Sequence, residues 1–105
     1  MQPPKVLVGR EFGAISMSIY LAAYDISSNR RRRQAAATLG RYGRRIQRSV
    51  FQLSTTKAEL IELRRELAIF LSSGDVLEII PIDQSSDRQR FSWGGYKNED
   101  VVAMF

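Results

Sequence analysis

Asp25 is the side chain in this sequence best placed for chemistry. It follows a short apolar run, residues 19–24, that predicts a buried strand, and it precedes Ser27, Ser28 and Asn29. Acidic groups at the carboxyl end of such a strand often bind ligands in α/β proteins. One carboxylate does not make a hydrolytic metal site, and a turn acid that accepts backbone N–H bonds is the simpler interpretation. In a two-fold dimer, however, Asp25 of both copies could share one hard cation, which would activate a water or orient a phosphate.

Arginine is concentrated directly after this aspartate. Residues 30–48 contain eight arginines, no lysine and no acid. Four of them open a predicted helix, where the positive end of the helix dipole disfavours them, and a phosphate bound at that end would reverse the effect. Arginine suits bidentate contacts with phosphate, although a solvated basic surface is the plainer alternative. The candidate nucleic-acid-binding residues are Arg30, Arg31, Arg32, Arg33, Arg44, Arg45 and Arg48.

Aromatic residues offer a weaker signal for nucleic-acid binding. Tyr20, Tyr24, Phe51 and Trp93 could stack on bases, but core packing is the more common role of such side chains. Phe51 lies beside the arginine-rich segment and is the best candidate for a functional aromatic. Core packing remains the favoured interpretation even there.

Composition limits the chemistry further. The chain has 105 residues, which suits one small domain, and its net charge of +5 favours an anionic partner. Because it has no cysteine and no histidine, a metal would be Mg²⁺ or Mn²⁺ held by oxygen, and a reducing cytoplasm is the expected location. No stretch approaches the roughly 20 apolar residues of a membrane span, so no membrane partner is expected. So small a protein often completes its core by two-fold pairing.

Strand and helix patterns alternate along the chain. A helix is expected over residues 30–42, with Gly43 as its C-terminal stop, and a strand over residues 45–53 that bends near its middle. Thr56 and Glu59 form a capping box that opens the next helix. The later predicted elements are a helix at 57–71, a strand at 76–82 that reaches a sheet edge, a polar turn at 85–89, a short strand at 91–93 and a final strand at 100–105.

This order favours an α+β fold with one sheet and both helices on the same face. The candidate is a ferredoxin-like βαββαβ sandwich over residues 17–105, with an additional C-terminal strand that the sheet of a second copy could cover. Residues 1–16 resemble an N-terminal extension or leader, because two prolines disfavour regular structure there and Met17 directly precedes the first convincing strand. Residues 5–8 could still form a short edge strand.

Several motifs stand together along residues 24–67. They are YDIS at residues 24–27, the arginine-led helix, RYG at 41–43, IQRSVFQ at 46–52 and ELIELRREL at 59–67. Together they resemble the family of small CRISPR-associated endonucleases called Cas2. The resemblance runs from Met17 to about residue 82. It implies a ferredoxin-like homodimer whose C-terminal strand adds to the partner's sheet, and a role in acquiring new CRISPR spacers. In that role the dimer lies between pairs of the integrase Cas1 and grips duplex DNA by its backbone, while the integrase performs strand transfer.

The same resemblance implies a metal-dependent nuclease activity in some members. Their strand-end aspartate is the metal ligand, and Asp25 occupies that position, while Tyr24, Arg32 and Phe51 fall where other functional residues are usually placed. Members often carry acids two or three positions after this aspartate. Here Ser28 and Asn29 stand nearby instead, which leaves Asp25 as the only acid of the motif.

Three functions therefore compete. The favoured one is a non-catalytic adaptor that bridges integrase subunits and duplex DNA, because the arginines are many and the acid stands alone. The alternative is a Mg²⁺-dependent endonuclease, acting on RNA or duplex DNA through Asp25 of both subunits. An RNA-cleaving toxin of related fold shares most of these features and would be distinguished by the absence of an integrase partner.

Overall fold

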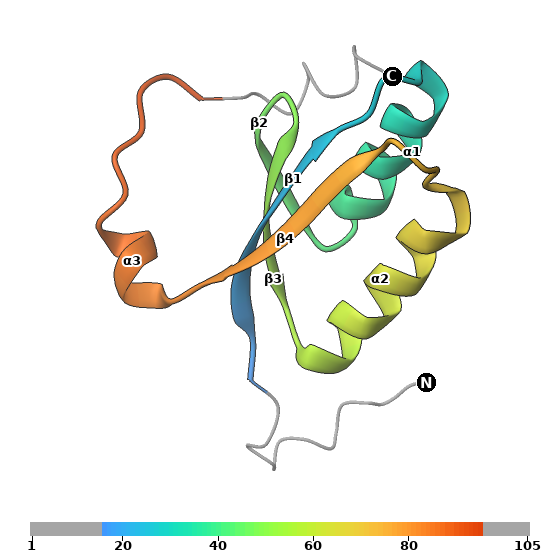
Figure 1. The fold of residues 1–105 in the computed structure, drawn as a ribbon. Coiled ribbons are helices and arrows are strands. Elements are labelled where there is room, and N and C mark those ends of the chain that lie inside the picture. The colour runs from blue at the N-terminus through green and yellow to red at the C-terminus, as the bar shows by residue number, and fades with distance from the viewer. Residues whose placement is uncertain (1–15, 96–105) are drawn as a thin grey trace.

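A four-stranded antiparallel sheet with two helices packed on one face forms the body of the protein (Figure 1). The computed structural model describes residues 16–95. Its elements are β1 (Ser18–Asp25), α1 (Asn29–Gly40), β2 (Gly43–Gln47), β3 (Val50–Thr55), α2 (Lys57–Phe70), β4 (Val76–Ile82) and α3 (Gln84–Arg88). The strand order is β2-β3-β1-β4. The predicted ferredoxin-like βαββαβ fold is confirmed, and the two strands between the helices are indeed short.

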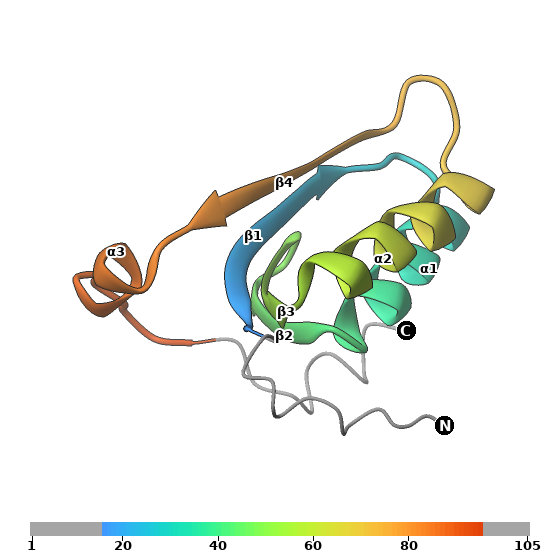
Figure 2. The same ribbon diagram turned by 90° about the horizontal axis from the view of Figure 1, so that it is seen from below.

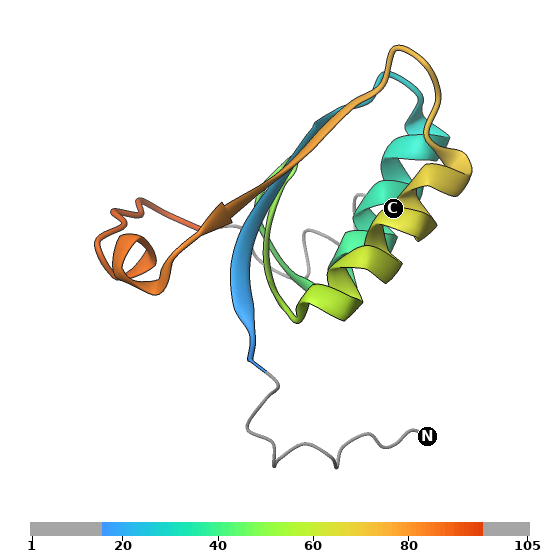
Figure 3. The same cartoon turned by 60° about the horizontal axis from the view of Figure 1, so that its bottom comes forward.

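The core lies between the sheet and the two helices, which cover the same face of the sheet (Figures 2 and 3). Alternate side chains of a strand point to opposite faces, and in β1 Tyr20, Ala22 and Tyr24 are buried on the helix side. The helices contribute their inward residues to the same core, as the helical spacing predicts. The fully or nearly fully buried helical residues are Ala35, Ala36, Leu39, Leu63 and Leu67.

Both helices begin at side-chain caps, and that of α2 is the capping box that the sequence indicates. The Ser28 hydroxyl accepts a hydrogen bond from the Arg31 backbone N–H at 3.2 Å. At α2 the capping box is complete, because Thr56 accepts from the Glu59 N–H at 3.1 Å and Glu59 accepts from the Thr56 N–H at 3.0 Å. These bonds satisfy backbone donors that a helix start leaves open.

Gly43 does not end α1, contrary to the sequence-based expectation. The helix ends at Gly40, its C-cap is Arg41, and Gly43 is the first residue of β2. A Cβ atom at Gly43 would lie 2.7 Å from the Cα atom of Leu53 and would clash with the Gln52 carbonyl oxygen. Glycine is needed there because two backbones approach closely.

The single bent strand expected over residues 45–53 is two strands in the structure, joined by a hairpin turn at the place of the expected bend. β2 and β3 pair antiparallel, with a register shift between Arg45 and Gln47, and residues 48–49 form the turn. β4 lies at the edge of the sheet beside β1, which accommodates Pro81.

Two expectations for the last described segment are wrong. Residues 84–88 form the short helix α3, capped by the Asp83 side chain at the Ser86 N–H (2.7 Å), in place of the expected polar turn. Residues 91–93 form no strand, and Phe91 and Trp93 are strongly exposed. The predictions for residues 5–8 and 100–105, and most of the predicted leader, lie outside the described residues. Over residues 16–95, none of the helices is long and apolar enough to span a bilayer.

The face of the sheet away from the helices keeps an apolar surface. The β1–β4 register sets Leu21 opposite Ile80 and Ile19 opposite Ile82 on that face. Ile80 is 47% exposed, and Val76 is 51% exposed. We call these apolar residues the apolar sheet face: Ile19, Leu21, Ala23, Val76, Ile80 and Ile82.

Candidate nucleic-acid interface

Tyr24 and Asp25, although consecutive, belong to different surfaces. Tyr24 ends the buried alternation of β1 and faces the helices, whereas Asp25 is exposed at the end of the strand, on the side of the apolar sheet face. Of the three candidate catalytic residues, Asp25, Tyr24 and Phe51, the first two therefore do not form one site within a single chain.

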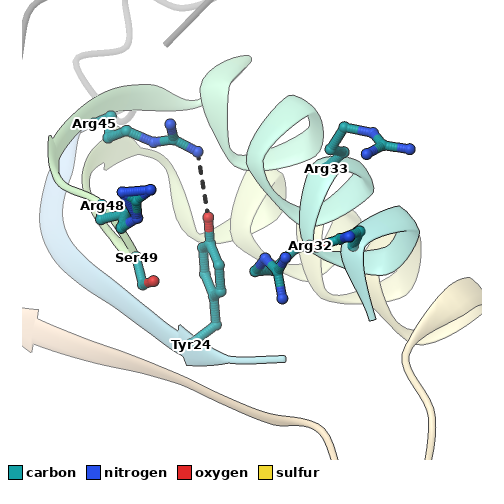
Figure 4. Close-up of a pocket in the computed structure, with 7 residues that line it drawn as sticks. Tyr24, Arg32, Arg33, Arg45, Arg48 and Ser49 are labelled. Carbon is teal, nitrogen blue, oxygen red and sulfur yellow. Dashed lines mark hydrogen bonds between the residues drawn. The ribbon is translucent and has the colours of Figure 1, made fainter. Parts of the chain in front are cut away.

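Tyr24 contributes to a pocket lined by arginines. The pocket lies between the start of α1 and the β2–β3 hairpin and has a volume of about 380 Å³. Arg32 and Arg33 border it from α1, and Arg45 and Arg48 from the hairpin (Figure 4). The lining residues, which we call the arginine pocket, are Tyr24, Asn29, Arg32, Arg33, Arg45, Arg48 and Ser49, with no carboxylate among them.

Arg45 is the buried cation of this pocket. Arg45 is 6% exposed, and its guanidinium carbon lies over the Phe51 ring, 5.2 Å from the ring centroid. One terminal nitrogen, Nη2, donates to the Tyr24 hydroxyl oxygen at 3.4 Å (Figure 4). Tyr24 and Phe51 are themselves stacked, with centroids 6.5 Å apart. The Phe51 ring and the Tyr24 hydroxyl thus hold a charged group near the pocket, and the cation–π attraction to Phe51 compensates part of its desolvation.

Phe51 acts from beneath the pocket and does not line it. Its ring is 2% exposed, so it is closed to stacking on a base and belongs to the core. This matches the role that the sequence analysis favours for it.

Arg32 also stabilises the loop that leads into α1. Its Nη1 donates to the carbonyl oxygens of Ile26 (2.8 Å) and Ser27 (3.1 Å). These bonds fix the Arg32 guanidinium near the N-terminus of α1, on the side of the pocket.

Arg31 has an intramolecular role that the sequence does not reveal. It pairs with both carboxylate oxygens of Asp75, through Nε at 2.7 Å and Nη2 at 3.1 Å. The Asp75 side chain is 3% exposed and also accepts from the Ser72 N–H at 2.9 Å. The hydrogen bond from Arg31, and after it the one from Ser72, lowers the pKa of Asp75 below its ordinary 3.8. The hydrogen bond to Asp75 in turn raises the pKa of Arg31. Arg31 thereby ties α1 to the start of β4.

The remaining two candidate arginines lie outside the arginine pocket. Arg30 is exposed in the first turn of α1, and Arg44 pairs with Gln52 in the sheet, one position out of phase with Arg45. The structure therefore gathers four of the seven predicted arginines. Asn29 and Ser49 line the same pocket and were not predicted; only their positions beside arginine motifs could have suggested them.

Asp25 is also the predicted metal ligand. Among residues 16–95 no three acidic side chains form a group that could hold an ion. Mg²⁺ is commonly bound by one or two carboxylates together with waters and substrate phosphates. An exposed Asp25 at a strand end fits the two-carboxylate arrangement when two copies contribute one each.

The fold and the pocket define a ferredoxin-like protein with a cationic cleft. The family model described as CRISPR associated protein Cas2 matches residues 17–90, and the chain belongs to that family. It is 38% identical over 79 residues to the CRISPR-associated endoribonuclease Cas2 3 of Synechocystis sp., covering 74% of this chain and 86% of the relative. It is 33% identical over 92 residues to the endoribonuclease Cas2 4 of Rhodospirillum rubrum, covering 87% and 74%.

Solved structures resemble this fold closely. A hypothetical protein from Thermus thermophilus has a TM-score of 0.68 at 34% identity, covering 78% of this chain and 98% of that one. Streptococcus pyogenes Cas2 has a TM-score of 0.67 at 26% identity, covering 72% and 99%.

Proposed function

We propose that this Cas2-family protein is a dimeric adaptor in the acquisition of CRISPR spacers, which grips duplex DNA by its phosphate backbone. The observation that carries the proposal is that four arginines from α1 and the hairpin line one pocket, with no carboxylate among its lining residues. Arg33 and Arg48 are exposed and lie on the two sides of the pocket, where a passing backbone would meet both. Contacts of this kind position DNA and do not read its sequence.

The apolar sheet face supports the homodimer in this proposal. Exposed Ile80 and half-buried Ile82 lie beside half-buried Leu21 and Ile19 and form an apolar region on a small chain, bordered along β4 by exposed Glu78. Apolar regions of this kind mark interaction sites. A two-fold pair would present two arginine pockets to one duplex. The integrase Cas1, as the partner that completes strand transfer, and the cytoplasmic location come with the family resemblance and the composition.

Duplex binding under changing salt tests the adaptor function. Affinity for a blunt duplex with hydroxyl ends should fall steeply with salt, and Arg33→Gln with Arg48→Gln should lower the log–log slope by about 0.9 for each phosphate that the variant no longer neutralises. The matched control, Arg64→Gln with Arg65→Gln on the exposed face of α2, should leave the slope unchanged. Co-purification of Cas1 from cells that express both proteins tests the bridging role. Equal slopes for both double variants would overturn the DNA grip.

A metal-dependent nuclease is the second candidate, because several relatives are named endoribonucleases. Asp25 of both copies would hold one Mg²⁺ or Mn²⁺, and a bound ion would supply an activated water and charge stabilisation at the scissile phosphate. Highly purified protein should then cleave RNA or duplex DNA, and both a chelator and Asp25→Asn should abolish the activity. Cleavage that survives in Asp25→Asn would assign it to a contaminating nuclease.

A further inference from the structure

The arginine pocket is too small to hold duplex DNA, the ligand proposed for the surface around it. Its volume of about 380 Å³ lies at the lower end of small-molecule sites. Arg33 and Arg48 are exposed, whereas Tyr24 and Arg45 are buried, so a double helix lying over the pocket would meet the exposed pair first. The occupant of the interior must be a small anionic group.

We propose that the arginine pocket binds a phosphomonoester group, either the terminal phosphate of a nucleic-acid strand or a free mononucleotide or phosphate ion. The proposal rests on the proposed function only in assigning an anionic ligand to these arginines. A phosphomonoester carries a charge of about −1.5 to −2 at neutral pH, against −1 for each backbone diester, and offers three acceptor oxygens. Arginines from three segments of the chain line the pocket, so it holds more than enough positive charge to neutralise such a group.

The Tyr24 hydroxyl gives the pocket a neutral donor as well. Its oxygen accepts the hydrogen bond from Arg45 Nη2, so its own O–H is left to donate. Tyr24 is 7% exposed, and its ring packs in the core, which fixes the hydroxyl at the pocket floor. The Asn29 amide, at the N-terminus of α1, borders the same space. Donors held in this way need little reorganisation to meet an anion.

The geometry makes the pocket's contribution separable from that of the DNA surface. Tyr24→Phe removes only the hydroxyl and keeps the buried ring. Arg48→Gln removes a charge from an exposed turn and serves as the second variant, should the core not accept the first change. Because Arg48 also belongs to the proposed DNA surface, this variant is compared only with inorganic phosphate and 5′-AMP. Arg64→Gln on α2 is the control that loses the same charge outside the pocket.

Calorimetric titration with inorganic phosphate and with 5′-AMP tests binding of the free group, with adenosine as the uncharged comparison. Strands with a 5′-phosphate or a 5′-hydroxyl, compared in anisotropy competition, test binding of a strand end. Phosphate-bearing ligands should bind more tightly than their hydroxyl counterparts, and Tyr24→Phe should weaken them at least about tenfold, as expected when a hydrogen bond to a charged group is removed. Arg48→Gln should also weaken the binding of inorganic phosphate and 5′-AMP, and Arg64→Gln should not.

Two outcomes overturn the proposal. One is equal affinity for phosphorylated and hydroxyl ligands, and the other is equal phosphate affinity in wild type, Tyr24→Phe and Arg48→Gln. Duplex binding with its normal salt slope under either outcome would leave the adaptor function standing. If the protein prefers strands with a 5′-phosphate while free phosphate and 5′-AMP do not bind, its ligand is the phosphorylated strand end. If only the small molecules bind, its ligand is a free nucleotide or phosphate.

Discussion

Tyr24 and Asp25 are adjacent in β1, yet the Tyr24 side chain faces the helices and Asp25 lies exposed on the other side of the sheet. A motif that reads as one site in the sequence is therefore divided by the sheet. The hydroxyl belongs to the arginine pocket, and the carboxylate lies beside the apolar sheet face, where a second copy could supply its counterpart. The proposed anion site and the proposed metal ligand thus lie on different surfaces of the same strand.

This division predicts that the two residues can be separated by mutation. Asp25→Asn should abolish Mn²⁺ binding, which electron paramagnetic resonance measures. It should change phosphate affinity by less than about twofold, because solvent screens a charge on the far side of the sheet. Tyr24→Phe should show the reverse pattern. A large loss of phosphate affinity in Asp25→Asn would mean that the two residues act on one ligand.

Gly43 provides a test of the fold. Gly43→Ala should destabilise the protein by roughly 1–3 kcal/mol or more, because the new methyl group would be forced against the β3 backbone. Gly40→Ala is the control in the same region. Its Cβ would meet Phe51 at an ordinary 4.0 Å, and alanine favours helix, so stability should rise by up to about 1 kcal/mol. Urea denaturation midpoints measure both, and a neutral Gly43→Ala would contradict the close approach of β2 and β3.

The elements of the fold were predictable because their signals are local. The capping box at Thr56 and the helical spacing of leucines in α2 lie within one segment of the chain. Gly43 was misread because a glycine after a helix serves equally as a C-cap or as a point of close backbone contact, and only the partner strand distinguishes them. The aromatic residues at 91 and 93 suggested a strand, but a strand requires a neighbour that local sequence does not specify.

The candidate site was predictable in composition but not in arrangement. Arg44 and Arg45 are neighbours whose alternation in β2 sends them to opposite faces, a consequence that follows once the strand is recognised. Arg32 binds nearby backbone carbonyls, but the partner of Arg31 is distant in the sequence. Asp75, far along the chain, captures Arg31, and no local pattern indicates this ion pair.

The Arg31–Asp75 pair predicts a pH dependence of stability. Because the pKa of Asp75 is lowered in the folded state, the pair stabilises the protein above the ordinary pKa of 3.8, and this contribution is lost as the pH falls through the lower folded value. Asp75→Asn should therefore lower Tm at neutral pH, and its difference from wild type should shrink below pH 3.8. Glu62→Gln removes the exposed 3.6 Å pair with Arg65 and should change Tm little at any pH. A constant Tm difference for Asp75→Asn across the range would show that its effect is not ionic.

The apolar sheet face predicts how two copies assemble. Ile80→Glu puts a charge on this face at a position that is 47% exposed in the single chain, so the subunit should still fold while the dimer dissociates. Ile69→Glu on α2, where the side chain is 84% exposed, is the matched control and should leave the dimer intact. Sedimentation velocity measures the subunit state, and circular dichroism confirms folding. Dimers of undiminished stability in Ile80→Glu would move the interface elsewhere, and with it the shared metal site at Asp25, because that site requires the two strand ends to meet across this face.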